Sequence, residues 1–158
     1  MNTGGQFEDV STIATLILYP IPEPAQIGQA TPGMCDDSPR EYDTEYTTAY
    51  DETTRRRVGY SHKRGSVTRF VVQLEYHHND AWQPVVRYDH DPASKHGHDV
   101  TADGLHLDVF RNGRKYRTDY IMPVGSADIG LDIAEAHLAE NIQRFIRRFE
   151  QWHEIKNR

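Results

Sequence analysis

The sequence lacks the cysteines and the long hydrophobic runs that mark secreted and membrane proteins. Its 158 residues include one cysteine, Cys35, which cannot form an intramolecular disulfide. The longest apolar run, residues 12–21, is about half the length of the roughly 20 residues that a membrane-spanning helix needs. The residues before this run are acidic, whereas a secretory signal begins with basic residues. We therefore expect a cytoplasmic protein with no membrane partner.

Apolar residues are scarce, and several catalytic motifs are missing. Hydrophobic side chains make up 37% of the chain, below the roughly 45–50% of an average soluble domain. We therefore expect part of the chain to lie outside the core. The sequence has no phosphate-cradling glycine loop, serine nucleophile elbow or cysteine–histidine pair. These absences argue against nucleotide-hydrolysing and acyl-transfer enzymes.

Charge divides the chain into two parts. Residues 1–52 carry one basic residue, Arg40, against ten acidic residues, which gives a net charge of −9. Residues 53–158 carry 17 basic and 14 acidic residues, which gives +3. An acidic arm on a mildly basic body is typical of a nucleic-acid-binding domain with a shielding tail. A solvated tail on a charge-balanced domain is the alternative.

The first 60 residues show no sustained hydrophobic period. Five prolines between positions 20 and 39 interrupt any helix, and residues 36–52 have few aliphatic side chains to bury. We therefore predict that residues 1–60 form a largely disordered acidic arm, in which residues 12–19 have the composition of a short strand. Residues 55–57, three consecutive arginines, read as a linker.

Residues 61–158 predict one α+β domain, a small antiparallel sheet of two β-hairpins packed by a long C-terminal helix. Apolar residues alternate within residues 67–76 and 105–111, as in half-buried strands, and each stretch is followed by a turn and a second strand. The turn Asn112-Gly113 suits a hairpin, since both positions need positive φ. A helix with a continuous apolar stripe follows the capping residue Ser126 or Asp128. The four strands are expected at residues 67–76, 82–88, 105–111 and 115–122.

A polar loop after the second of these strands is the candidate active site. Four of the nine histidines lie between His90 and His106, and histidine suits acid–base work near neutral pH. In metal-free RNA cleavage, His96 and His98 would transfer protons to and from the ribose and the leaving oxygen. Asp89 would orient one imidazole, and Arg87 would stabilise charge on the phosphorus.

The remaining polar residues have more than one interpretation. A metal site built from His96, His98 and Asp99, with His90 or Asp91, is one alternative; a loop whose imidazoles only hydrogen-bond is another. We predict no bound metal and no cofactor. Exposed basic residues can bind the RNA backbone or merely solvate the surface. The predicted phosphate-binding residues are Lys95, Arg111, Arg114, Arg117, Arg144 and Arg148.

The run Arg87-Tyr88-Asp89-x-x-Pro92, followed by His96 and His98, resembles the TumE family of small toxins from toxin–antitoxin pairs. In that family an Arg-Tyr-Asp-x-x-Pro run precedes histidines and a closing helix. The resemblance covers roughly residues 70–106, and it implies a toxin with a cognate antitoxin protein as its partner. Residues 69–152 also resemble an uncharacterised group of haloarchaeal proteins, which implies no function.

Together these patterns favour a ribonuclease toxin that acts on RNA by histidine acid–base chemistry. Two other functions stay open. One is a non-catalytic module that binds a protein or nucleic acid, with the acidic arm engaging the partner. The other is a metal-dependent phosphoesterase.

Overall fold

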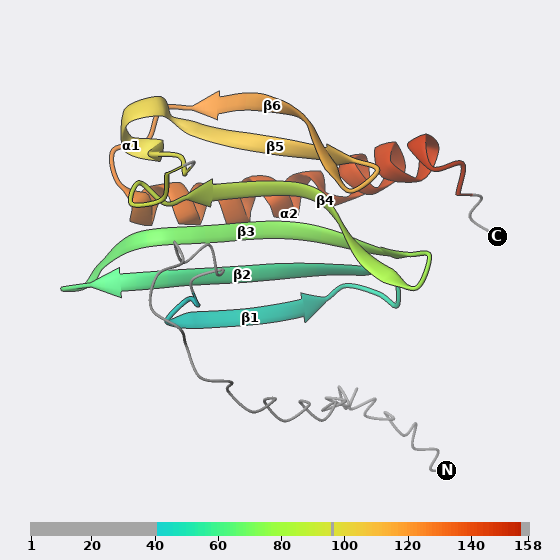
Figure 1. Cartoon of the computed structure of the whole chain (residues 1–158), viewed down its shortest axis with the longest axis horizontal. Coiled ribbons are helices and arrows are strands. Elements are labelled where there is room, and N and C mark those ends of the chain that lie inside the picture. Colours follow the sequence, from blue (N-terminus) through green and yellow to red (C-terminus); the bar gives the residue numbers. More distant parts are fainter. Residues whose placement is uncertain (1–40, 96, 156–158) are drawn as a thin grey trace, which may run out of the picture. The chain divides into compact units, whose positions relative to one another are not determined.

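The structure is a computed structural model that describes residues 41–95 and 97–155. Six strands form one antiparallel sheet in the order β1-β2-β3-β4-β5-β6, and helix α2 packs against β3, β4 and β5 (Figure 1). This arrangement confirms the predicted α+β class, with an antiparallel sheet and a C-terminal helix. The elements are β1 Thr44–Ala49, β2 Thr54–Lys63, β3 Ser66–His78, β4 Ala81–His90, α1 Val100–Asp103, β5 Leu105–Arg111, β6 Arg114–Met122 and α2 Ala127–Trp152.

The sheet begins earlier than the sequence suggested. Strands β1 and β2 lie largely within residues 1–60, so the prediction of a disordered arm is wrong for residues 44–60, and the arginine triplet is not a linker. The charged side chains of β2 are held by neighbouring strands: Arg55 pairs with Glu75 of β3, and Arg57 pairs with Glu45 of β1. Such cross-strand ion pairs stabilise the association of polar strands. The strand expected at residues 12–19, like the rest of residues 1–40, lies outside the described residues.

Turns and caps follow local sequence rules. Asn112 and Gly113 join β5 to β6 with φ of 52° and 70°, as a tight hairpin requires. Ser126 is the N-cap of α2 and accepts a hydrogen bond from the amide of Ile129. Strand β3 extends through His78, so His77 and His78 belong to this strand rather than to the turn that follows it.

The two faces of the sheet differ in chemistry. Phe70 contacts Gly130 of α2, and Tyr76 packs on Phe149 of the same helix, so the even-numbered residues of β3 face α2. The odd-numbered residues therefore point to the other face, because side chains alternate along a strand. There, cross-strand partners form one polar row across five strands. We call this the polar face; its row consists of Arg57, Gln73, Arg87, Asp108 and Thr118.

Candidate functional site

Two aspartates and a histidine meet on the polar face. Asp89 lies two residues after Arg87 on β4, and Asp108 lies on β5 opposite Arg87. His98 comes from the loop between β4 and α1. One ligand atom from each of Asp89, His98 and Asp108 lies within 4.8 Å of the others. The structure therefore brings together two predicted site residues, Asp89 and His98, with a third group that the sequence analysis did not select.

His106 and Tyr120 extend this cluster. The ring centroids of His98 and His106 are 5.8 Å apart, and those of His106 and Tyr120 are 5.5 Å apart. The Nδ1 atom of His106 is buried and has no hydrogen-bond partner among the described residues. Tyr120 is 58% exposed, and its ring covers Gly104, where a Cβ atom would lie 2.6 Å from Cε2 of the tyrosine. An exposed aromatic ring thus borders the histidine pair.

Asp108 is the most buried carboxylate of the cluster. It is 6% exposed, accepts a 2.6 Å hydrogen bond from Thr118 Oγ1, and lies 2.9 Å from Nζ of Lys115. Burial raises the pKa of Asp89, which His98 lowers and the negative charge of Asp108 raises further. Crowded, partly desolvated titratable groups of this kind are characteristic of reactive sites.

Arg87 is fixed beside the cluster by its neighbours. Its Nε atom donates a 2.6 Å hydrogen bond to Oε1 of Gln73, and its guanidinium lies 5.1 Å from the ring centroid of Phe110. Gln73 in turn donates to Glu75. These contacts hold a positive charge next to Asp89 and Asp108 without a direct ion pair to either in the described part of the chain.

The loop before α1 uses its other polar groups for structure. The amide of Val100 donates to Nδ1 of His90, and Asp99 caps α1 by accepting from the amide and hydroxyl of Thr101. The amide of Asp91 donates to the carbonyl of His98, which closes the loop. His90 and Asp99 therefore position the loop. The groups that lie beside His98 are Asp89 and Asp108, rather than the His90, Asp91 and Asp99 considered from the sequence. Lys95 is exposed, and His96 lies outside the described residues.

Four of the predicted phosphate-binding arginines lie at a separate place, beside α2. Arg111 and Arg148 both lie over the ring of Trp152. Arg144 lies over Phe145, and the charge of Arg117 lowers the pKa of Arg148. The fifth, Arg114, begins β6 after the hairpin turn. The predicted site is therefore divided between the polar face and the side of the sheet that carries α2.

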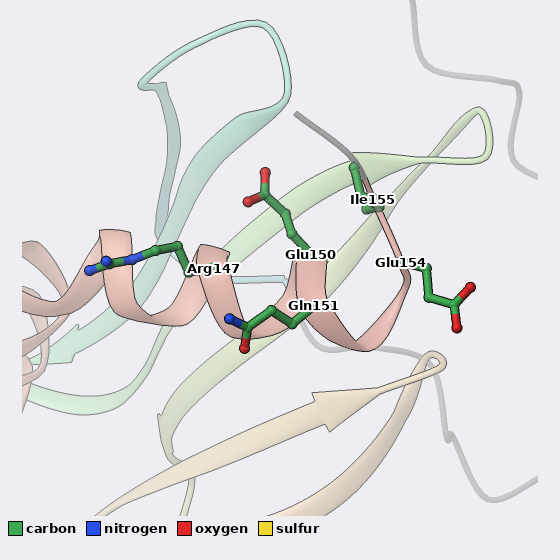
Figure 2. Close-up of a pocket in the computed structure, with 5 residues that line it drawn as sticks. All are labelled: Arg147, Glu150, Gln151, Glu154 and Ile155. Atoms are coloured by element: carbon green, nitrogen blue, oxygen red, sulfur yellow. The ribbon is translucent and has the colours of Figure 1, made fainter. Parts of the chain in front are cut away.

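The hollow drawn in Figure 2 contains none of the predicted site residues. It lies at the C-terminal end of α2 and is lined by Arg147, Glu150, Gln151, Glu154 and Ile155. Two of these five side chains are carboxylates, which makes this side of the helix less suited to an anion than the side that carries Arg144 and Arg148.

Sequence reasoning missed Asp108, Lys115 and Thr118, and left the direction of His106 open. The signal was present in β5. Leu105, Leu107 and Val109 are buried on the helix side, so alternation places His106 and Asp108 on the opposite face. What alternation could not supply was the register that sets Asp108 beside Arg87.

Most of the chain matches one known family. Residues 40–155 match a family model described as "Domain of unknown function (DUF7718)", and the chain belongs to this family. No curated protein and no solved structure matches the chain. Within the described residues, no helix is long and apolar enough to cross a membrane.

Proposed function

We propose that this member of the DUF7718 family is a ribonuclease of the toxin type, with its active site on the polar face. The observation that carries the proposal is the grouping of two imidazoles with two carboxylates. His98 lies beside Asp89 and Asp108, and its ring centroid is 5.8 Å from that of His106. Asp89, His106 and Asp108 lie on the neighbouring strands β4 and β5, and His98 lies in the loop between these strands. Strands fix the relative positions of such groups, which favours acid–base catalysis.

The two histidines have different surroundings, which suggests different roles. His98 lies beside the carboxylates of Asp89 and Asp108, and we assign it the role of general acid. His106 has aromatic neighbours and an Nδ1 atom without a hydrogen-bond partner among the described residues, and we assign it the role of general base. The sequence analysis paired His98 with His96, which lies outside the described residues. We therefore pair His98 with His106 as the second acid–base group.

The proposed reaction is cleavage by the ribose 2′-hydroxyl. His106 accepts the proton of this hydroxyl while the 2′-oxygen attacks the phosphorus. The bond between phosphorus and the 5′-oxygen breaks, and His98 donates a proton to that oxygen. The products are a 2′,3′-cyclic phosphate and a 5′-hydroxyl, and the charges of Arg87 and Lys115 lie where they can stabilise the phosphorane.

The toxin assignment rests on the resemblance of the Arg87-Tyr88-Asp89 run to the TumE family. Asp89 of this run lies beside His98 and Asp108, which supports the proposal. A cognate antitoxin is the partner that the resemblance implies. Expression of the chain is therefore expected to slow growth, and co-expression of the antitoxin to restore it.

A second candidate function, a metal-dependent phosphoesterase, is favoured by one observation. Asp89, His98 and Asp108 present one ligand atom each within 4.8 Å, a grouping that suits a divalent cation with oxygen and nitrogen ligands. Lys115 and Thr118 each contact one oxygen of Asp108, so a metal would share an oxygen with one of them. A chelator distinguishes the two functions.

The test is RNA cleavage by the full chain, with and without EDTA, beside His98→Ala and His106→Ala. His62→Ala is the matched control, because His62 is an exposed histidine on β2. We expect EDTA-resistant cleavage that yields cyclic phosphate ends, and a loss of about a hundredfold or more in each site variant. Unchanged cleavage in both variants would refute the assigned residues. Cleavage that EDTA abolishes supports the phosphoesterase, and a folded chain that cleaves nothing supports a non-catalytic binding module.

A further inference from the structure

A group of arginines beside α2 carries positive charge with little compensation. Burial, followed by the positive charge of Arg117, lowers the pKa of Arg148; Asp119 acts in the opposite direction, and Arg144 lowers the pKa further. Asp119 pairs with Arg117 at 3.0 Å, but within the described part of the chain no carboxylate pairs with Arg111, Arg144 or Arg148. One guanidinium nitrogen of Arg148, Nη2, is buried there without a hydrogen-bond partner. Such a group is complementary to an anion that bears several oxygens.

Aromatic rings lie among these cations. The guanidinium carbons of Arg111 and Arg148 lie 5.3 and 5.2 Å from the ring centroid of Trp152, and the ring of Tyr116 lies 5.4 Å from that of Trp152. Tyr116 is 54% exposed. Charged groups that follow a phosphate backbone, combined with exposed rings on which bases stack, are the usual features of a single-strand nucleic-acid site. We call this set the arginine–aromatic surface: Arg111, Tyr116, Arg117, Arg144, Arg148 and Trp152.

Strand β6 connects this surface to the polar face. A register shift at Val109 and Phe110 lets Tyr116 and Arg117 both lie on the helix side. Lys115, before them, pairs with Asp108 on the polar face, and Tyr120, after them, contacts His106 there. Because β6 is an edge of the sheet, a flexible chain can pass over it from one face to the other.

We propose that single-stranded RNA crosses the edge strand β6, with backbone phosphates on the arginine–aromatic surface and a base on Tyr116. The proposal rests on the proposed function for the identity of the ligand and adds where, and in what form, it binds. A duplex does not fit this path, because double-stranded nucleic acid is too stiff to turn around one β-strand. The surface therefore selects single strands before cleavage.

Arg147 provides a matched control on the same helix. It is exposed, donates to the carbonyl of Gln143 one turn earlier, and lines the hollow that contains Glu150 and Glu154 (Figure 2). Changing Arg147 to Gln removes the same charge as Arg144→Gln, but outside the arginine–aromatic surface. A purely general effect of net charge would weaken binding equally in both variants.

The experiment measures binding of the full chain to a fluorescent 2′-O-methyl oligonucleotide at several salt concentrations. This probe lacks the hydroxyl that the proposed reaction needs, so binding is measured whether or not the chain is a ribonuclease. We expect Arg144→Gln and Arg148→Gln each to weaken binding about threefold. Each is expected to reduce the slope of log K against log salt by about 0.7. Tyr116→Leu is expected to weaken binding about tenfold with an unchanged slope, whereas Arg147→Gln binds like the wild type. A duplex of the same sequence is expected to bind at least tenfold more weakly.

Several results would overturn the proposal: no binding, equal effects of Arg144→Gln and Arg147→Gln, or equal affinity for the duplex. Thermal unfolding of each variant confirms that it is folded. Arg144 is exposed, so its variant keeps the test valid if Arg148→Gln disturbs packing. If the variants alter binding as expected but the chain cleaves no RNA, the proposed binding surface is supported and only the proposed catalysis is refuted.

Discussion

Asp89 is expected to cost the protein stability at neutral pH, and Asp89→Asn is expected to recover it. The pKa of Asp89 is raised in the folded chain, mainly by burial, with a further contribution from Asp108. The unfolded chain therefore loses this proton at a lower pH than the folded chain does. Stability falls as pH rises through the ordinary aspartate pKa of about 4, and the loss is complete above the raised pKa.

Burial makes the larger contribution to this effect, and repulsion by Asp108, whose size follows from the distance between the two carboxylates, adds to it. At 4.8 Å, the limit of their separation, two unit charges repel by about 3 kcal/mol at an effective dielectric constant of about 20. His98, Arg87 and Lys115 lower the pKa of Asp89 and so offset this repulsion. A net gain of about 1 kcal/mol in Asp89→Asn remains, which corresponds to an increase of about 4 °C in melting temperature.

The assay is thermal unfolding of wild type and Asp89→Asn at pH 7 and pH 3. Asp132→Asn serves as the control, because Asp132 is exposed on α2 and its change should alter stability by less than about 0.5 kcal/mol. The Asn variant should be more stable at pH 7 and indistinguishable at pH 3, where both side chains are neutral. An Asn variant that is equally or less stable at pH 7 would show that the charge of Asp89 does not destabilise the folded chain. The raised pKa of Asp89 would then no longer support an active site at this position.

Two further predictions concern a glycine and a histidine near the core. Gly104→Ala is expected to destabilise the fold by roughly 2 kcal/mol and to lower cleavage, because Gly104 has φ of 79° and a Cβ atom would displace Tyr120. Gly65→Ala, with φ of 84° but no atom within 4 Å of the added Cβ, should show the backbone cost alone, and equal losses in both would contradict the contact argument. Burial lowers the pKa of His137, so urea unfolding should show stability falling as pH drops below about 6.5, by at most about 1.4 kcal/mol per pH unit. His137→Gln should reduce this fall, whereas an unchanged pH profile would show that other groups cause it.

The elements that local sequence patterns specify were predictable. Helix α2 has a cap at Ser126 and a continuous apolar stripe, and the hairpin between β5 and β6 has the turn Asn112-Gly113. Both signals depend on residues a few positions apart, which can be read without knowing the fold. Strands β3 and β5 were located for the same reason, since apolar and polar residues alternate along them, and β4 and β6 follow them in hairpins.

Strands β1 and β2 were not predictable from composition. Their association depends on partners distant in sequence, such as Arg55 with Glu75 and Tyr46 with Glu135 of α2. The same reason explains the division of the predicted site. Asp89 and His98 follow each other closely along the chain, but Asp108 joins them through the register of β4 and β5. Only the fold shows that Arg111, Arg144 and Arg148 lie on the side of the sheet that carries α2.

Several polar groups are buried on the face of the sheet opposite α2. Gln73, Glu75 and Asp108 are 5–6% exposed, although α2 packs on the other face. Burying such groups costs free energy unless each finds a partner. Here Gln73 bonds to Glu75 and Arg87, and Asp108 bonds to Thr118 and pairs with Lys115. A sheet that served only as a scaffold would be stable with solvated polar side chains on this face. The network instead fixes the charges that surround Asp89, His98 and Asp108, which is what a catalytic site requires of its supporting residues.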